Sequence, residues 1–401
     1  MARAGDSAQP PGTGPKSILL LGAGELGKEL AISAQRMGLR VVAADRYDGA
    51  PAMQVAHAAE VLSLLDGTAL EGVIRTHRPD LIFPELEAVS VETLIDLEKE
   101  GFRVVPNAAA AGLVADRGAL RAVASEELGL RTPLSRRVRS REALEEACDG
   151  LGYPVVVKPV RSSSGRGQTV VTGAPRLDRA WQFAVEEADG EGEGTDGVVV
   201  EEYIAFHSEV TLLALRDRNA DLHFLPLIAH RQDRGGFRES WLPADADENV
   251  LAEIREMATR VMDRLGGTGL TGLEFFLTDT GPVFSEISLG PHDTGMVTLV
   301  AHDLSQFDLH LRAVLGLTIP APREYGPAAC AVILADREGE VVGYSGIERA
   351  LQVESTQVRI FGKPHAEPFR RMGVALATGS SVEEARARAL EAAARVRVLC
   401  R

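Results

Sequence analysis

Glu274 and Glu286 lie in the stretch GLEFFLTDTGPVFSEIS, where their spacing could serve a divalent cation. Asp279, Thr280 and Gly281 form a turn signal between two strand-like runs, so the stretch predicts a β-hairpin. A hairpin centred on Thr280 sets the two glutamates directly opposite each other, where like charges destabilise the pair unless a cation neutralises them. Mg²⁺ is commonly held by one or two carboxylates, with phosphate oxygens completing its shell. The alternative interpretation is a solvated strand face that carries both glutamates by chance.

A loop of small residues, RSSSGRGQ at 161–168, follows the strand-like run YPVVVK. Small side chains let backbone N–H groups approach phosphate oxygens, and Lys158 precedes the loop closely enough to reach the same phosphates. The loop differs from a Walker loop because it lacks the GK[ST] ending and because a second strand, not a helix, follows it. An ordinary hairpin turn is the alternative, but Lys158 and the glutamate pair together favour phosphate binding.

The stretch GAGELG at 22–27 matches the G-x-G-x-x-G pattern between a predicted strand and a predicted helix, and Asp45 ends the next strand. A nicotinamide-dependent enzyme is one interpretation of this pattern. No acid/base pair for hydride chemistry accompanies it in the sequence, and the same turn can contact another ligand. The pattern alone is therefore weakly specific.

Three cations, Lys363, Arg370 and Arg371, lie close together in the stretch FGKPHAEPFRRMG. Such a group can hold a phosphate dianion, and arginine adds a planar fork of donors. Exposed charges on a solvated loop are the alternative. His230, Arg231 and His292 are further candidate polar residues of a site, although a lone histidine more often has a structural role.

The elements that position these residues fall into three predicted domains. Residues 16–120 alternate strands and helices, including the runs LIFPE and FRVVP, and predict a doubly wound parallel sheet. Residues 121–320 hold the strand–loop–strand unit, an acidic glycine-rich loop at 186–197 and the hairpin. Residues 321–401 predict a small β-rich domain that a final helix, SVEEARARALEAAARV, closes. The fold class is therefore mixed α/β (α+β), and residues 1–15 are typical of a flexible tail.

Composition narrows the classes of function. The chain has 401 residues, of which 45% are hydrophobic and 25% charged, as in ordinary soluble globular proteins. Its formal net charge of -15 argues against a general nucleic-acid binder. No apolar run is long enough to cross a bilayer, and the N-terminus lacks the apolar centre of a signal peptide, so we expect no membrane partner and a cytoplasmic location. Three widely spaced cysteines suit a reducing compartment.

Together these motifs resemble one family. The strand–SSSGRGQ–strand unit, VVVEEYI and the LEFF…FSEIS hairpin are similar to the ATP-grasp fold. The stretches GAGELGKE, FPELEA, KPVRSSSGRGQ, AHRQ, RESW, PHDTGMVTL, FGKP and RRMGVALAT resemble the formate-dependent phosphoribosylglycinamide formyltransferases. The resemblance runs from about residue 17 to residue 398. It implies ATP and Mg²⁺ as cofactors, formate activated as formyl phosphate, glycinamide ribonucleotide as the phosphoribosyl amine that accepts the formyl group, and a homodimer.

The resemblance also assigns roles to particular residues. The family's ATP contacts fall on Arg117, Lys158, Ser163, Ser164, Gly165, Arg166, Gly167, Gln168, Glu201, Glu202, Tyr203, Ile204 and Glu209. Its magnesium ligands fall on Glu274 and Glu286. Its glycinamide ribonucleotide contacts fall on Glu25, Leu26, Glu85, Asp293, Lys363, Arg370 and Arg371. We expect catalysis to involve Lys158, Arg161, Arg166 and Asp293.

The chain departs from the family at several positions. Leu289 and Gly290 stand where the family normally has Pro-Arg, and ATP-grasp ligases commonly use an arginine there near the transferred phosphoryl group. Arg166 replaces the usual loop lysine and Arg161 is an extra cation, so either could supply the missing charge.

Two alternatives to formylation follow from this departure. Gly290 removes charge and volume together, which favours a carboxylate–amine ligase of a specialised pathway that uses another acid or amine. The other alternative is a protein that binds nucleotides but no longer transfers phosphoryl groups, although Lys158, Glu274 and Glu286 argue against it.

Overall fold

A computed structural model of the chain describes residues 17–160, 166–188, 197–233 and 235–401. The tail expected at residues 1–15 lies outside the described residues, as do Arg161 to Gly165 of the loop and most of the acidic loop. Among the described residues, no helix is both long and apolar enough to span a membrane.

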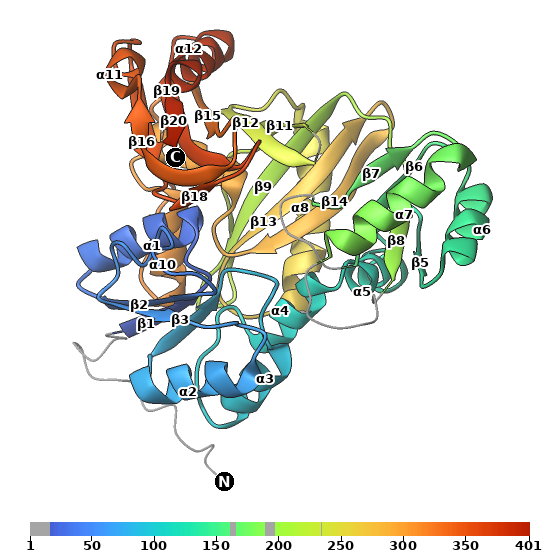
Figure 1. Cartoon of the computed structure of the whole chain (residues 1–401), viewed down its shortest axis with the longest axis horizontal. Helices are drawn as coiled ribbons and strands as arrows, with labels where there is room; N and C mark the ends of the chain where they lie inside the picture. Colours follow the sequence, from blue (N-terminus) through green and yellow to red (C-terminus); the bar gives the residue numbers. More distant parts are fainter. Residues whose placement is uncertain (1–16, 161–165, 189–196, 234) are drawn as a thin grey trace.

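The N-terminal part is a parallel sheet of strand order β3-β2-β1-β4 with helices packed on it (Figure 1). Its strands are β1 Ser17–Leu21, β2 Arg40–Asp45, β3 Ala58–Val61 and β4 Leu81–Pro84, and its helices are α1 Glu25–Arg36, α2 Gly67–His77, α3 Val91–Lys99 and α4 Ala108–Ala115. The run FRVVP, predicted to be a strand, makes only an isolated bridge between Val104 and Ile82. That prediction is wrong because Pro106 offers no N–H and Asn107 already caps α4.

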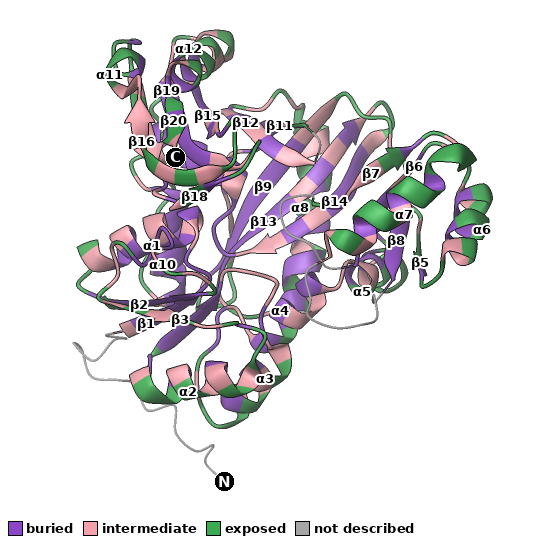
Figure 2. Ribbon diagram, viewed as in Figure 1, coloured by how far each residue is buried: buried purple, intermediate pink, exposed green. Residues whose placement is uncertain are grey.

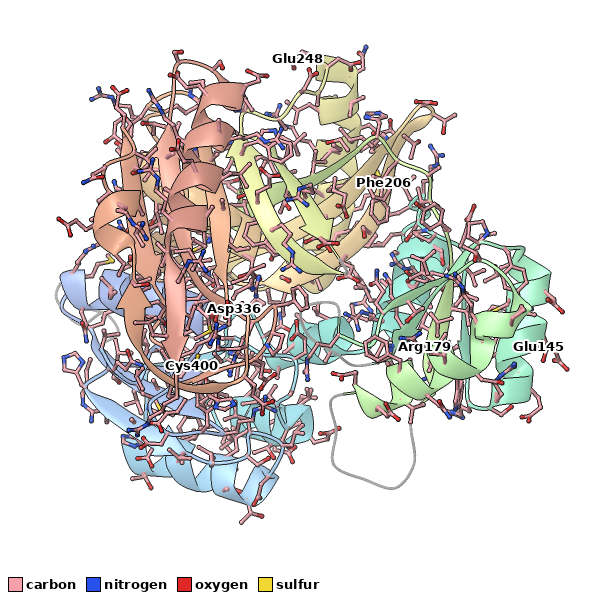
Figure 3. The ribbon with its side chains drawn as sticks, turned by 45° about the horizontal axis from the view of Figure 1, so that its top comes forward. Glu145, Arg179, Phe206, Glu248, Asp336 and Cys400 are labelled. Atoms are coloured by element: carbon pink, nitrogen blue, oxygen red, sulfur yellow. The ribbon has the colours of Figure 1, made fainter. Side chains whose placement is uncertain are left out.

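A smaller antiparallel sheet, β5-β8-β6-β7, follows. Two short helical segments lead into it, and further helices cover it, so that it projects to one side of the molecule (Figure 3). Glu145 and Arg179 lie exposed on its outer helices. The elements are α5 Arg117–Ala122, η1 Val123–Glu127, β5 Ser135–Val138, α6 Arg141–Leu151, β6 Val155–Pro159, β7 Thr169–Val171, η2 Ala174–Arg176, α7 Leu177–Glu186 and β8 Val198–Glu202.

The largest sheet has the order β14-β13-β9-β11-β12-β15-β19-β17, with β10 paired to β9. Its first part comprises β9 Ser208–Arg216, β10 Leu222–Phe224, β11 Ile228–Asp233, β12 Gly236–Leu242, β13 Gly269–Thr278 and β14 Gly281–Leu289. Helix α8 Glu248–Leu265 packs against β9, β13 and β14. After β14 come η3 Asp293–Val297, α9 Thr298–Ala301 and α10 Gln306–Val314, and α10 packs on α1 of the N-terminal sheet.

Three of the C-terminal strands, β15, β19 and β17, extend this sheet, because β15 pairs with β12 on one side and with β19 on the other. The other three form a separate sheet of order β18-β16-β20. The elements are β15 Ala328–Leu334, β16 Gly339–Ser345, α11 Ile347–Ala350, β17 Thr356–Ile360, β18 His365–Ala366, β19 Arg371–Thr378, α12 Val382–Arg395 and β20 Arg397–Cys400. The expectation that α12 closes the chain is wrong, since β20 follows it and pairs with β16.

Small residues let α12 approach the sheet closely. Ala385, Ala389 and Ala392 are fully buried on α12 and belong to one cluster with alanines of β15 and β19. Figure 2 shows the same division, with buried positions on the inner faces and exposed positions on the outer helical surfaces. The contact between alanines leaves no space for longer side chains.

We therefore predict that Ala389→Leu lowers the free energy of unfolding by about 1–3 kcal/mol, because the added atoms have no space in this layer. Urea unfolding followed by circular dichroism measures the change. The neighbouring Leu390→Ala is the control, because Leu390 is 41% exposed. Equal midpoints for Ala389→Leu and the wild-type chain would contradict the packing argument.

Candidate active site

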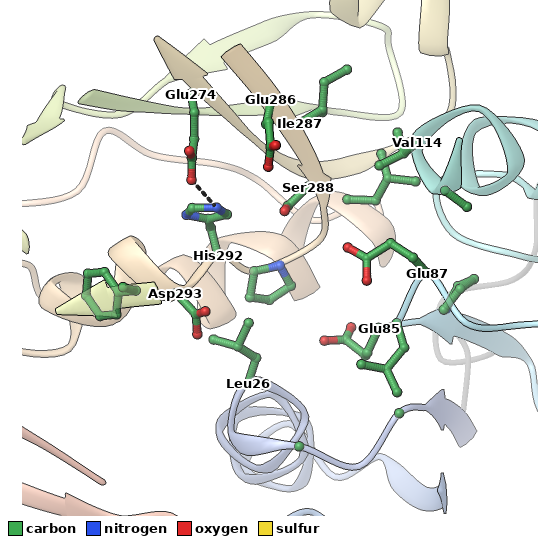
Figure 4. Close-up of a pocket in the computed structure, with 18 of the residues that line it drawn as sticks. Leu26, Glu85, Glu87, Val114, Glu274, Glu286, Ile287, Ser288, His292 and Asp293 are labelled. Carbon is green, nitrogen blue, oxygen red and sulfur yellow. Dashed lines mark ion pairs between the residues drawn. The ribbon is translucent and has the colours of Figure 1, made fainter. Parts of the chain in front are cut away.

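A cavity of about 310 Å³ lies where the three parts of the chain meet. Helix α1 and the end of β4 form one wall, the β13–β14 hairpin and the residues after it form another, and Lys363 and Arg371 come from the C-terminal strands. Figure 4 shows the acidic side chains Glu85, Glu274, Glu286 and others turned toward this space. The fold thus brings together residues that are far apart in the sequence.

The hairpin places Glu274 opposite Glu286, as the sequence predicts. The centre of the hairpin differs from the expectation. Thr278 pairs with Gly281, so the turn is centred between Asp279 and Thr280 and not on Thr280. A β-bulge beyond Glu274 shifts the register by one residue and restores the pairing. The bulge therefore brings the two carboxylates directly opposite each other on the hairpin.

Glu274 is held by histidine. The Nε2 of His292 lies 3.1 Å from one carboxylate oxygen, and the Nε2 of His230 lies 3.9 Å from the other. Burial opposes ionisation, but the hydrogen bond from His292 and the neighbouring His230 outweigh it and lower the pKa of Glu274 to about 2. A Cβ at Gly272 would lie 2.9 Å from the His292 ring, so glycine at 272 makes room for this contact.

Glu286 faces cations. Lys158 Nζ and Arg117 Nε each lie 3.5 Å from the carboxylate of Glu286. Lys158 is also bound at 2.8 Å to the buried Glu201, whose second partner is Arg121 at 2.7 Å. Burial disfavours the charge on Glu201, yet Arg121 and Lys158 outweigh that cost and lower its pKa to about 2.

Arg121 is a residue that sequence reasoning missed. It is only 4% exposed, and its guanidinium also donates to the carbonyl oxygen of Ser285 at 2.6 Å. It thereby joins α5 to the bulge of the hairpin and fixes the carboxylate that positions Lys158. An arginine on an otherwise ordinary helix carries no distinguishing spacing, so no pattern in the sequence indicates this role.

The hairpin carboxylates fit a magnesium ion in chemical type, since both are hard oxygen donors on facing strands. Within the described part of the chain, no group of three or more His, Cys, Asp or Glu side chains could hold a metal on its own. A cation bound here would therefore take further ligands from water or from phosphate oxygens.

A second charged cluster lies across the cavity. Lys363 Nζ is 2.9 Å from Glu25, and Arg371 reaches both Glu25, at 3.5 Å, and Asp293. Burial opposes the charge on Glu25, but Lys363 and Arg371 outweigh it and lower its pKa to about 2. Leu26 lines the same wall. These residues, which the family resemblance groups as substrate contacts, thus lie together.

Arg370 lies apart from them. Its guanidinium donates to the carbonyl oxygen of His365 at 3.0 Å and lies over the ring of Tyr47, and it is not among the residues that line the cavity. Its predicted substrate contact would need the side chain to turn.

The remaining predicted ATP contacts lie along β8 and around the loop. Glu202 accepts a hydrogen bond from the backbone N–H of Leu134 at 3.2 Å, and Tyr203 is 41% exposed. Glu209 faces the glutamate pair, and burial followed by the charge of Glu274 raises its pKa to about 7. Of the loop, Arg166, Gly167, Gln168 are described, and Ile204 follows Tyr203 after the strand.

Gly167 shows why the loop needs glycine. Its φ is +72°, and a Cβ there would lie 2.5 Å from the ring of Pro159. No side chain fits at this position without displacing the end of β6.

The glycine turn does not present Asp45 to a ligand. Asp45 is buried and accepts hydrogen bonds from the backbone N–H of Ala23 at 2.7 Å and of Arg46 at 2.7 Å. A nicotinamide site would need this carboxylate for a ribose hydroxyl. Because it stabilises its own turn instead, the structure favours a different ligand beside Glu25 and Leu26.

Glu85 differs from the other acids of the cavity. Within the described residues its carboxyl group has no hydrogen-bond donor and no cation in contact, and burial raises its pKa to about 8. Gly290, at φ +80°, lies beside it, and a Cβ on Gly290 would be 3.6 Å from the Oε1 of Glu85. The position where the resembling family has arginine is thus adjacent to an unpaired acid.

Comparison with known proteins matches three stretches of the chain to known domain families. Residues 16–114 match the ribonucleotide synthetase preATP-grasp domain, residues 123–307 the ATP-grasp domain, and residues 328–396 the domain described as PurT, C-terminal. The formate-dependent phosphoribosylglycinamide formyltransferase of Synechococcus sp. (strain CC9902) is 50% identical over 385 residues, which cover 96% of this chain and 97% of that protein. The chain belongs to the formate-dependent phosphoribosylglycinamide formyltransferase family.

Solved structures agree with this family. Glycinamide-RNase-transformylase T from Mycobacterium tuberculosis is 32% identical, with a TM-score of 0.76 over 94% of this chain and 99% of that one. The N5-carboxyaminoimidazole ribonucleotide synthetase of Thermotoga maritima is 26% identical, with a TM-score of 0.82 over 96% of this chain and 100% of that one. As a formyltransferase-family member with an ATP-grasp domain, the chain is an ATP-grasp enzyme.

We predict that Arg121→Met destabilises the chain by about 3 kcal/mol, because among the described residues the buried Glu201 then keeps Lys158 as its one cationic partner. Denaturant unfolding measures the loss. Arg136→Met is the matched control, since Arg136 lies exposed on the neighbouring β5. Similar losses for both variants would show that the buried ion pair has no special weight.

We also predict that Glu85→Gln makes the chain more stable at alkaline pH. The folded pKa of about 8 lies above the ordinary value of 4.5, so the wild-type chain loses stability as pH rises from about 4.5 to about 8. The loss has an upper limit on the order of 4 kcal/mol, reduced by any water in the cavity. Unfolding midpoints from pH 5 to about 9 should therefore diverge between the two proteins, and parallel curves would contradict a raised pKa.

Proposed function

We propose that this enzyme uses ATP and formate to formylate glycinamide ribonucleotide, with formyl phosphate as the intermediate. The observation that carries the proposal is the identity of 50% along nearly the whole length of relatives that are named for this activity. Two charged clusters that face one cavity support it, because a phosphorylated substrate and a nucleotide need separate charge-compensated sites.

The reaction runs in two steps. A formate oxygen attacks the γ-phosphorus of ATP, the bond from that phosphorus to the bridging oxygen breaks, and ADP leaves. The amine then attacks the formyl carbon, the bond from that carbon to the phosphate oxygen breaks, and inorganic phosphate leaves. Phosphoryl transfer of this kind depends mainly on positioning and on charge stabilisation.

In this proposal Lys158 binds the transferred phosphoryl group, and Glu201 with Arg121 keeps its ammonium in place. Glu274 and Glu286 hold Mg²⁺, which neutralises phosphate charge when bound. The ATP contacts are those assigned in the sequence analysis, including Ser163, Ser164 and Gly165 outside the described residues. Arg161, also outside them, and Arg166 supply positive charge for catalysis. Asp293 and the cations Lys363, Arg370 and Arg371 receive the ribonucleotide, with Glu25 and Leu26 beside its ribose phosphate.

We also propose the domain bounds, the oligomeric state, the location and the partners of the enzyme. The three domains span residues 16–120, 121–320 and 321–401, and the enzyme acts as a cytoplasmic homodimer on small molecules, without a nucleic-acid or membrane partner. The net charge of -15 supports the absence of a nucleic-acid partner.

One observation favours a different acid as a second candidate. Around Gly290 the nearest atom to an added Cβ, other than those of its chain neighbours, is Glu85 Oε1 at 3.6 Å, so the site has neither the charge nor the bulk of an arginine at this point. Acetate, propionate and glycine therefore belong beside formate in any substrate test.

We predict that the purified chain releases ADP when ATP, Mg²⁺, formate and glycinamide ribonucleotide are all present. Glu286→Gln should lower kcat on the order of 10²-fold or more, since it removes one carboxylate from the cation site. A coupled assay for ADP measures both. Glu248→Gln is the control, because Glu248 lies exposed at the start of α8 (Figure 3) and is not among the residues that line the cavity.

The outcomes separate the candidates. Turnover with another acid but not with formate would replace formylation by the second candidate. ATP binding in calorimetry with no turnover for any acid would favour a nucleotide-binding protein instead of an enzyme of this type.

A further inference from the structure

We propose that Glu85 is a catalytic residue that takes the proton from the attacking amine, and that Gly290 leaves its carboxylate free to do so. The inference rests on the proposed function, because it concerns the second step of that reaction. It assigns the proton transfer, which none of the paired acids in the cavity is suited to perform.

The position of Glu85 is fixed by the fold. It follows directly after β4, and its backbone N–H donates to the carbonyl oxygen of Leu21 at 2.8 Å, at the end of β1. A Cβ on Gly22 would lie 2.7 Å from Leu86 and 3.1 Å from Glu85, so the glycine turn packs tightly against this segment. The carboxyl group therefore extends from a rigid sheet edge into the cavity.

Glu85 also lines the same cavity as the two clusters that the reaction must connect. Gly290, its neighbour, lies on the segment that joins Glu286 of the hairpin to Asp293 of the second cluster. Figure 4 shows Glu85 on the same side of the cavity as Glu87, with Leu26 of α1 beside it and Ser288 of β14 above. A phosphoribosyl amine whose phosphate binds Lys363 and Arg371 would carry its amine past Glu85 toward the hairpin.

The other charged groups of the cavity have partners of their own. They comprise Glu25 on α1, Glu87 on the same loop as Glu85, Arg117 on α5, Glu274 and Glu286 on the hairpin, His292 and Asp293 after it, and Lys363 and Arg371 of the C-terminal part. None of them accounts for the raised pKa of Glu85, whose cause is burial alone.

A base of this strength suits an amine. An ordinary α-amino group has a pKa of about 8, close to that of Glu85 at about 8, so the proton is shared almost evenly between them. Matched affinities of this kind are what general-base catalysis needs near neutral pH. A carboxylate paired with arginine would have a much lower pKa and would bind the ammonium ion without removing its proton.

The ammonium group of the substrate gives one proton to the Glu85 carboxylate and becomes a neutral amine. Its lone pair forms the C–N bond to the formyl carbon, and the C–O bond to the phosphate breaks. The second proton lost from nitrogen leaves with the phosphate, and Glu85 returns its proton to solvent through the open cavity.

The test compares two acceptors at several pH values. Glycinamide ribonucleotide must lose a proton before it attacks, whereas hydroxylamine is already unprotonated at neutral pH and needs no base. In the wild-type enzyme, kcat/KM for the ribonucleotide should rise with pH, with a midpoint near 8. Glu85→Gln should lower kcat for the ribonucleotide by about 10²-fold or more, and formation of formohydroxamate from hydroxylamine should stay within about threefold of wild type. Glu85→Asp should recover part of the lost rate.

Three further variants test the role of Gly290 and the effect of charge. Gly290→Arg should lower kcat for the ribonucleotide, because a guanidinium beside Glu85 stabilises its carboxylate and makes it too weak a base for the ammonium ion. Arginine is strained at φ +80°, so Leu289→Pro/Gly290→Arg is the second form of this variant. Glu92→Gln is the control for the loss of one negative charge, because Glu92 lies exposed at the start of α3.

Equal losses with both acceptors in Glu85→Gln, or an unchanged rate with the ribonucleotide, would overturn the proposed role of Glu85 while leaving formylation intact. No ADP release by the wild-type enzyme with formate and either acceptor would overturn the proposed function itself.

Discussion

The cavity depends on one electrostatic constraint, which is that carboxylates placed together below the surface must be neutralised by the chain's own cations. Charge buried without a partner is costly, whereas a hydrogen-bonded ion pair retains it at modest cost. Glu201 is held by Arg121 and Lys158, Glu25 by Lys363 and Arg371, and Glu274 by His292. The charged clusters exist because these partners arrive from other parts of the chain.

The same pairs hold the parts of the chain together. Glu25 on α1 binds residues from beyond β17 and from β19, and Arg121 on α5 reaches the hairpin through Ser285. Such contacts place residues of the N-terminal sheet and of the C-terminal strands around one space. A ligand that replaces the partner of any one acid would therefore affect the relation between the parts, and not only the local charge.

Local patterns allowed much of the fold and of the site to be predicted. The β1–α1–β2 unit, the strands around the loop and the pairing of Glu274 with Glu286 follow from alternation, turn residues and spacing. Predictions failed where a distant contact or a missing donor decides the outcome. Pro106 prevents a strand at FRVVP, and β20 forms only because β16 is there to pair with it. Arg121 and the bulge after Glu274 have no local signature, since each matters only in the folded chain.

Within the described residues, Glu85 differs from the other acids of the cavity because no cation or hydrogen-bond donor contacts its carboxyl group. If burial of acids were simply tolerated here, several would lack partners, yet the acids beside it have cations or histidine within contact distance. An arginine at 290 would have supplied the missing partner, and the backbone at φ +80° with glycine there keeps the position free of any side chain. Among the described acids that line the cavity, Glu85 is the one without a cation or hydrogen-bond donor in contact, so the site is arranged to receive a cation from outside. The ammonium group of an amine substrate is such a cation, and its affinity for a proton matches that of the acid it meets.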